Sequence, residues 1–95
     1  MTVVDEALDV LKQNKKTMRC SAMQSLLVAL DFRVRDGKLG GHKTFSHPQL
    51  KGFMGGSYDC GHKTDGVLKV PYVLKVAGVL RQYKFELEKL MEHRK

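Results

Sequence analysis

The sequence predicts an α+β fold whose elements follow in the order α-α-β-β-β-α. Near both ends of the chain, apolar residues recur every three or four positions, which is typical of amphipathic helices. In the middle, apolar and polar residues alternate and glycines separate the segments, which indicates short strands joined by turns. We therefore expect a small antiparallel sheet with helices on one face, and the 95 residues suit a single domain.

Two helices are expected before the sheet. Thr2 followed by Asp5 resembles a helix N-cap with an acidic first turn, and apolar residues at helical spacing predict a helix over residues 3–13. Ser21 can cap a second helix that ends near Asp31. The apolar face of this second helix consists of Met23, Leu26, Leu27 and Leu30. Each helix is amphipathic, so each should bury one face.

The central residues predict a β-hairpin. Apolar and basic residues alternate over residues 32–35, as in a half-buried strand, and Asp36-Gly37 is a turn signal. Residues 42–47 form the expected returning strand, which Pro48 ends.

The last third of the chain predicts a loop, a strand and a helix. Residues 49–66 contain five glycines and are expected to form a long surface loop. Residues 66–70 predict the third strand, and Pro71 suits the first turn of a helix. An apolar stripe with alternate spacings of three and four then predicts one long helix over residues 72–92.

Strand periodicity predicts a basic, hydroxyl-rich face on this sheet. If Phe32, Val34 and Phe45 face the helices, their neighbours in sequence face the other way. The side chains expected on this open face are Arg33, Arg35, His42, Thr44, Ser46 and Lys69. Basic groups neutralise phosphates and hydroxyls hydrogen-bond them, so the face suits phosphate binding. The alternative is a plain solvated sheet face, on which Arg and Lys are common.

The charge balance also favours a polyanionic partner. Seventeen Lys and Arg against ten Asp and Glu give a formal net charge of +7. In a short domain such a surplus favours RNA, DNA or an anionic membrane. The alternative is that the lysines serve only solubility.

The expected location is the cytoplasm, without a membrane partner. No segment approaches the roughly 18 apolar residues of a membrane span. The N-terminus lacks the basic start and apolar stretch of a signal peptide. Cys20 and Cys60 are accordingly expected to be free thiols rather than a disulfide.

His42 is the candidate catalytic residue. It follows Gly40 and Gly41, which would let a nucleic-acid backbone approach closely. Histidine titrates near neutral pH, so it can accept a proton from a ribose 2′-hydroxyl or donate one to a leaving 5′-oxygen. Lys43 and the nearby arginines would stabilise the charge that grows on the phosphoryl group. The alternative is an ordinary polar surface histidine.

The stretch from Gly40 to Pro48, Gly-Gly-His-Lys-Thr-Phe-Ser-His-Pro, resembles the glycine–histidine strand motif of the HicA toxins, ribonucleases of bacterial toxin–antitoxin pairs. The similarity covers roughly residues 17–83 of a single domain, 1–95. Residues 1–16 are then an N-terminal helical extension, and residues 84–95 extend the last helix. The resemblance implies a double-stranded-RNA-binding-domain-like α-β-β-β-α fold with these two additions.

The resemblance also implies the toxin activity of a type II toxin–antitoxin system. HicA toxins are endoribonucleases that cleave mRNA without a metal or other cofactor and so arrest translation; their single catalytic histidine maps onto His42. The residues expected to bind RNA are Arg33, Arg35, Gly41, Lys43, Thr44 and Lys69. A HicB-like antitoxin would cover the active site. The chain has Gly41 where many members have serine, so one hydroxyl contact is missing.

The sequence contains candidate zinc ligands but not a usual zinc-binding pattern. Cys60 and His62 could supply two ligands, with Cys20 and His47 to complete the site. Cys-x-His is not a usual zinc spacing, so no metal is expected. Strand parity points His47 opposite to the candidate catalytic histidine, and we expect a structural role for it.

Two alternative functions use the same features differently. A non-catalytic RNA-binding module would use the basic face without His42. A protein-interaction adaptor would use the apolar side chains beyond residue 83, which either pack on the first helix or bind a partner helix: Phe85, Leu87, Leu90 and Met91. Tyr58 could stack on a base, although packing is the more common role of a loop tyrosine.

Overall fold

The computed structural model of the protein describes residues 2–38, 40–61 and 65–92, which form an α+β fold around a three-stranded antiparallel sheet. The elements are α1 (Val3–Gln13), α2 (Cys20–Ala29), β1 (Arg33–Asp36), β2 (His42–Ser46), β3 (Gly56–Asp59), α3 (Val70–Gln82) and α4 (Lys84–Glu92). The sheet order is β1-β2-β3, so β2 is central. The predicted α+β class and antiparallel sheet are confirmed.

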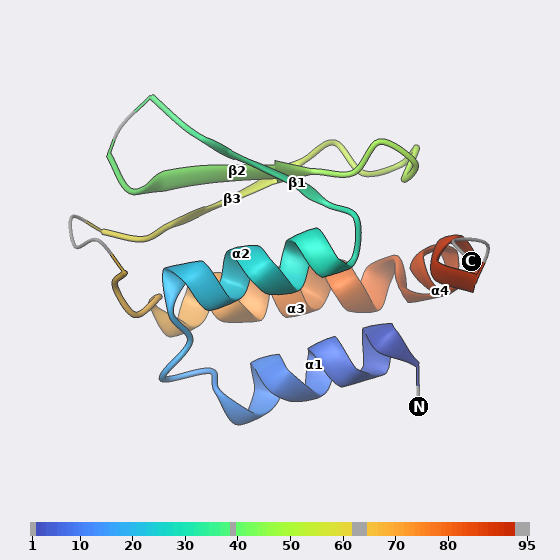
Figure 1. Ribbon diagram of the computed structural model, residues 1–95, viewed down its shortest axis with the longest axis horizontal. Helices are drawn as coiled ribbons and strands as arrows, with labels where there is room; N and C mark the ends of the chain where they lie inside the picture. Colours follow the sequence, from blue (N-terminus) through green and yellow to red (C-terminus); the bar gives the residue numbers. More distant parts are fainter. Residues whose placement is uncertain (1, 39, 62–64, 93–95) are drawn as a thin grey trace.

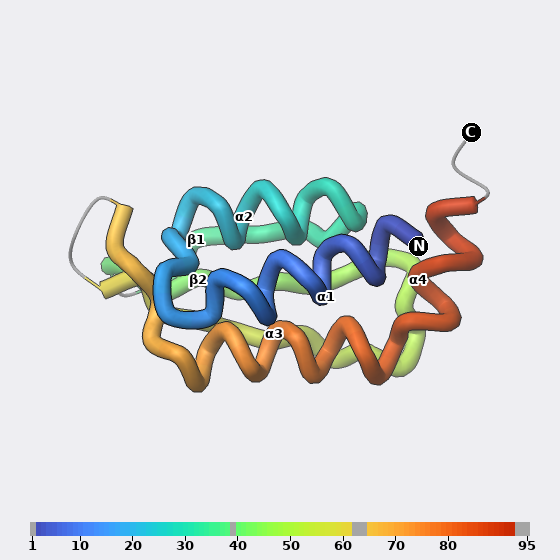
Figure 2. Tube along the Cα trace, turned by 90° about the horizontal axis from the view of Figure 1, so that it is seen from below, coloured from blue at the N-terminus to red at the C-terminus, as the bar shows by residue number. Residues whose placement is uncertain are grey.

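The elements form three layers. Figure 1 shows the sheet at the top, α2 and α3 beneath it, and α1 below these two helices. Seen from below, α1 lies between α2 and α3 (Figure 2). Within the described part of the chain, no helix covers the outer face of the sheet. One face of the sheet is therefore packed and the other is open.

The core lies between the sheet and the helices. Its fully buried side chains include Phe45 and Tyr58 from the sheet and Leu27 and Val76 from the second layer. α1 contributes Val4, which is also fully buried. Burial of these apolar surfaces is the main force that holds the layers together.

The first two helices form largely where the sequence predicts them. Thr2 caps α1, and its side chain accepts a hydrogen bond from the Asp5 backbone N–H at 3.1 Å. The N-cap of α2 is Arg19, not Ser21. The carboxylate of Asp65 accepts from the Ser21 backbone N–H at 2.9 Å and from the Ser21 hydroxyl at 3.0 Å. A distant carboxylate thus satisfies this helix start, which local sequence cannot show.

The third strand lies inside the segment that was predicted to be a loop. Gly56–Asp59 pairs antiparallel with β2, and Phe45 is the register partner of Gly56. The predicted strand at residues 66–70 is wrong, because this segment makes only an isolated bridge, between Arg19 and Val67. A Gly-Ser-Tyr-Asp strand carries one apolar side chain, so it shows almost no alternating pattern.

The predicted long last helix is two helices. α3 ends at its C-cap Tyr83, and α4 then runs at a steep angle to α3 (Figure 2). The Tyr83 ring packs against Phe53 with their centroids 5.6 Å apart. The turn directs α4 toward α1, and Leu87 is fully buried. Leu87 thus packs inside the molecule, whereas Phe85 is 65% exposed, so binding of a partner helix by this stripe stays a prediction.

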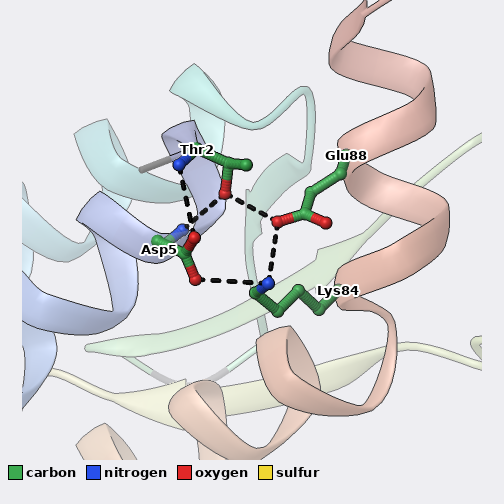
Figure 3. A network of polar contacts seen from close by, with 4 residues as sticks. All are labelled: Thr2, Asp5, Lys84 and Glu88. Carbon is green, nitrogen blue, oxygen red and sulfur yellow. Dashed lines mark hydrogen bonds and ion pairs between the residues drawn. The ribbon is translucent and has the colours of Figure 1, made fainter.

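A polar network fixes α4 to the start of α1 (Figure 3). The Thr2 hydroxyl donates to Glu88 Oε2 at 2.7 Å, and Lys84 Nζ lies 3.3 Å from Asp5 Oδ1 and 2.9 Å from Glu88 Oε2. The hydrogen bond from the Thr2 backbone N–H, with Lys84 nearby, lowers the pKa of Asp5. Hydrogen bonds from the Thr2 and Lys84 side chains lower the pKa of Glu88.

The cysteine prediction is wrong, because Cys20 and Cys60 form a disulfide with their Cα atoms 5.5 Å apart. The bond joins the first residue of α2 to the residue that follows β3. It closes a sequence separation of 40 residues, for which chain entropy predicts a stabilisation of about 4 kcal/mol. The end of β3 reaches the start of α2, and their distance in sequence did not indicate this contact.

Candidate functional site

The open face of the sheet carries most of the side chains that strand parity predicted. Arg33 pairs with Ser46 and Arg35 with Thr44, so these four side chains share one face. His42 lies on the same face, two residues before Thr44. The register of β3 adds Ser57, which is opposite Thr44, and Asp59, which is opposite His42. The face thus combines basic, hydroxyl and imidazole groups with one carboxylate.

The His42 imidazole lies over Gly37. The Gly37 backbone N–H donates to the His42 carbonyl at 2.7 Å, which closes the β1–β2 hairpin. A Cβ atom added at Gly37 would overlap the His42 ring, so the bare glycine provides the space that the imidazole occupies. His42 is half-buried as a result, and its ring position is set by packing.

Asp59 is the acidic neighbour of His42 that the sequence prediction missed. The neighbouring residues Gly41 and Cys60 form a hydrogen-bonded pair, in which the Cys60 N–H donates to the Gly41 carbonyl at 2.7 Å. Because hydrogen-bonded and non-hydrogen-bonded pairs alternate along antiparallel strands, His42 and Asp59 form a non-hydrogen-bonded pair. Side chains of such pairs are close neighbours. Asp59 Oδ1 also accepts from the Gly61 N–H at 2.7 Å, which holds the carboxylate at the end of β3. Because residues 49–66 were expected to form a loop, this pair was not predicted.

Gly41 makes a close contact within the chain. Its φ of +82° lies in the left-handed region that favours glycine. A Cβ at this position would collide with the Gly61 carbonyl oxygen. Gly41 therefore allows close contact within the chain, whereas an added Cβ at Gly40 meets no atom within 4 Å. The close approach of a nucleic-acid backbone to these two glycines stays a prediction.

Lys43 does not belong to the open face. It lies on the helix side with Phe45, since residues two apart in a strand share a face. Its ammonium group forms an ion pair with Asp36, the register partner on β1. The side chain is 22% exposed, against 80% for Asp36. Lys43 therefore does not share the face of the arginines, and its role in RNA binding stays a prediction, whereas Thr44 is exposed on that face as expected.

Lys69 is not on the open face either. It is the N-cap of α3, because the strand expected around it does not form. Together with Tyr72 it lines a small hollow at the end of β3, beside Gly40, Asp59 and Gly61. Lys69 is therefore near the His42 end of the sheet, although it belongs to a different element from the predicted one.

His47 is structural, as parity predicted. It is 6% exposed, and its Nε2 lies 3.0 Å from the Leu30 carbonyl oxygen. Nδ1 accepts from the Gln49 backbone N–H at 3.2 Å, so the neutral ring with its proton on Nε2 satisfies both contacts. Tyr58 is also internal, and burial raises its pKa to about 12. It cannot stack on a base from this position.

A shallow hollow occupies the open face between β2 and the turn before β3. We call it the Met54 hollow, and it is lined by His42, Thr44, Ser46, Met54, Ser57 and Lys75, with Phe45, Gly55 and Gly56 between them. Lys75 comes from α3, in the layer beneath the sheet. Ser57, Met54 and Lys75 were not among the predicted site residues. Strand parity would have found Ser57 once β3 was known, but no local signal identifies Met54 or Lys75.

The electrostatics of the open face favour an anion over most of its area. Neither Arg33 nor Arg35 pairs with a carboxylate among the residues that the structure describes, and both side chains are at least partly exposed. Of the described strand residues, Asp59 is the one carboxylate on this face. The arrangement can bind phosphate through the arginines and hydroxyls and can transfer a proton through the imidazole.

Within the described ranges, no group of three His, Cys, Asp or Glu residues is arranged to hold a metal ion. His62, one of the weighed zinc ligands, lies outside those ranges. None of the helices in the described ranges is both long enough and apolar enough to cross a membrane.

Comparison with protein-family models, curated proteins and solved structures found no match to the chain.

Proposed function

We propose that the protein is an endoribonuclease that binds single-stranded mRNA on the open face and cleaves it with His42. The observation that carries the proposal is the surroundings of His42 on the sheet. Two arginines without a carboxylate partner in the described ranges share its face with several hydroxyls, and a carboxylate lies on the neighbouring strand. These are the groups that a phosphoryl-transfer site requires for binding and proton transfer.

The reaction needs one proton acceptor and one proton donor. His42 takes the proton of a ribose 2′-hydroxyl, the 2′-oxygen forms a bond to phosphorus, and the bond from phosphorus to the 5′-oxygen breaks. The departing 5′-oxygen takes a proton from a solvent water, and the hydroxide that remains takes the proton held by His42. The products are a 2′,3′-cyclic phosphate and a free 5′-hydroxyl. Arg33 and Arg35 stabilise the negative charge on the phosphoryl oxygens.

The resemblance to the HicA toxins supports this proposal. The order α2-β1-β2-β3-α3 agrees with an α-β-β-β-α fold of the double-stranded-RNA-binding type, with α1 and α4 as additions. We propose that the protein is the toxin of a type II pair, and that a HicB-like antitoxin covers the open face. One feature departs from the motif: Gly41 serves a contact with Gly61, not an open approach.

The proposed substrate, mRNA, implies the cytoplasm. The Cys20–Cys60 disulfide weighs against that location, because reducing compartments keep most thiols reduced. Both cysteines are only 7% exposed, and a buried bond is slow to meet a reductant. Alkylation of the protein directly upon cell lysis would count its free thiols.

The test is cleavage of a long mRNA in the presence of EDTA. We expect His42→Ala and His42→Gln to lower the cleavage rate by about 10²- to 10⁴-fold, the usual contribution of one acid–base group. Lys12→Ala removes an exposed basic side chain from α1, in the layer farthest from the sheet, and is the control that should keep the activity. If the wild type does not cut, or if His42→Ala cuts as fast as the wild type, the proposal is wrong.

A non-catalytic RNA-binding module is the second candidate, and the position of the His42 ring favours it. The ring lies over Gly37, and the carboxylate of Asp59 is engaged by the Gly61 N–H. This candidate predicts RNA binding that weakens steeply with salt, and no growth arrest upon expression. A growth arrest that His42→Ala relieves would contradict it.

A further inference from the structure

Met54 is unusual among the apolar residues of this protein. It is 95% exposed, whereas Phe85, the next most exposed large apolar residue of the described ranges, is 65% exposed. It stands immediately before Gly55, whose φ of +106° lies in the region that favours glycine. The backbone there turns into β3 and leaves the methionine at the edge of the open face. An apolar side chain that its own chain leaves so exposed is available to a ligand.

The Met54 hollow has an apolar end and a polar wall. His42 begins β2 and Ser46 ends it, and Ser57 lies opposite Thr44. Met54 precedes β3 beside the Ser46 end, so the three hydroxyl residues lie between His42 and Met54. Side chains two apart along a strand are about 7 Å apart, so His42 to Ser46 spans roughly 14 Å. This length accommodates one nucleoside, with its ribose near the imidazole and its base toward the methionine.

The chemistry of the wall fits a nucleobase better than a phosphate or a sugar alone. A base has flat faces, on which a polarizable thioether packs well, and a polar edge. Hydroxyl groups both donate and accept hydrogen bonds, so they can pair with the edge of any base. Lys75, which also lines the hollow, can neutralise the adjoining phosphate. Unpaired RNA bases are the ones that splay out to reach such sites.

We propose that the Met54 hollow is a subsite for a single unpaired nucleobase of RNA. Met54 covers one face of the base, the hydroxyls of Thr44, Ser46 and Ser57 contact its edge, and the attached ribose lies at His42. The ligand class rests on the proposed function, since RNA is its source. The subsite adds what the catalytic histidine cannot supply, which is a binding position for one unpaired base that places the attached ribose at the imidazole.

NMR on the intact oxidised protein with labelled methionine methyl groups tests this proposal. Uridine 3′-monophosphate and adenosine 3′-monophosphate are the probes, and ribose 5-phosphate and inorganic phosphate are the controls. We expect the Met54 methyl and the Ser57 amide to shift in a saturable manner with at least one nucleotide and with neither control. The Met91 methyl, on α4, is the internal reference. Equal shifts of Met54 with ribose 5-phosphate, or no shift with either nucleotide, would overturn the subsite.

Substitutions separate this subsite from catalysis. Met54→Ala should weaken nucleotide binding by about 2- to 10-fold, whereas Met54→Leu should retain most of it, because leucine keeps an apolar contact of similar size. Val28→Ala removes another exposed apolar side chain, from α2, and should change nothing. Unaltered binding in Met54→Ala contradicts the subsite even if His42 proves catalytic. Loss of binding in Met54→Ala supports it even if the protein does not cleave RNA.

Discussion

The two faces of the sheet place similar residues in opposite situations. His47, Lys43 and Tyr58 lie on the helix side, where they are buried or paired: His47 contacts two backbone groups, Lys43 pairs with Asp36, and Tyr58 is enclosed. His42 and Arg35 lie on the open side, where they have no charged partner among the described residues apart from the neighbouring Asp59. The face on which a residue lies, and not its type alone, therefore decides whether its polar group is paired inside the molecule or accessible to a ligand.

The largest expected effect distinguishes the faces by stability. Phe45→Ala removes a fully buried ring and should lower the free energy of unfolding by about 3–5 kcal/mol. Thr44→Ala, one residue earlier on the open face, should change it by less than about 0.5 kcal/mol. Urea denaturation followed by circular dichroism measures both. Comparable losses of stability in the two variants would show that the outer face is packed as well.

The next effect distinguishes the faces by RNA affinity. Arg33→Ala and Arg35→Ala should each weaken binding across all RNA sequences, and removing one arginine–phosphate interaction should lower the salt-dependence slope by about 0.7. Lys43→Ala removes the same charge from the helix side and is the matched control. Fluorescence anisotropy with a labelled single-stranded RNA at several salt concentrations measures these changes. If Lys43→Ala weakens binding as much as either arginine variant, the assignment of faces to functions fails.

The smallest expected effect is on acid stability, and it concerns the helix layers. Hydrogen bonds from the Ser21 backbone and side chain lower the pKa of Asp65, and the pKa values of Asp5 and Glu88 are also lowered. A carboxylate with a depressed folded-state pKa stabilises the fold above its ordinary pKa, and this contribution disappears as the pH falls through the folded value. We therefore expect Tm to fall progressively as the pH is lowered from about 4.

Asp65→Asn is the variant that tests this acid sensitivity. It should lower Tm at pH 7 and make the fall below about pH 4 shallower, because the substituted residue no longer titrates. Thermal unfolding followed by circular dichroism from acidic to neutral pH measures the effect. A variant with the same acid-induced fall as the wild type would show that Asp65 does not contribute.

The elements with strong local patterns were predictable. α1 begins and ends where the apolar spacing placed it, and the hairpin of β1 and β2 follows the alternation around Phe45. Parity alone also placed His42 opposite to His47. The open face itself was therefore predictable, apart from the β3 contribution.

Other features depend on contacts between distant segments. The glycine that begins β3 accommodates the Phe45 ring, whose Cζ would lie 2.6 Å from an added Cβ. This contact excludes a larger residue at Gly56. The strand therefore lacks the alternation of apolar and polar side chains by which strands are recognised. The pairing of Asp59 with His42 and the position of Lys69 both follow from this strand. Neither feature could be predicted without knowledge of the position of β3.

The sequence by itself determined the α+β class, the basic character of the chain and the face on which His42 lies. These properties depend on composition and on periodicities of about two and 3.6 residues, which neighbouring residues set. Only the tertiary structure decided the third strand, the break at Tyr83, the Cys20–Cys60 bond and the Met54 hollow. Each of these joins residues far apart in the chain, and packing of the whole core is what brings them into contact.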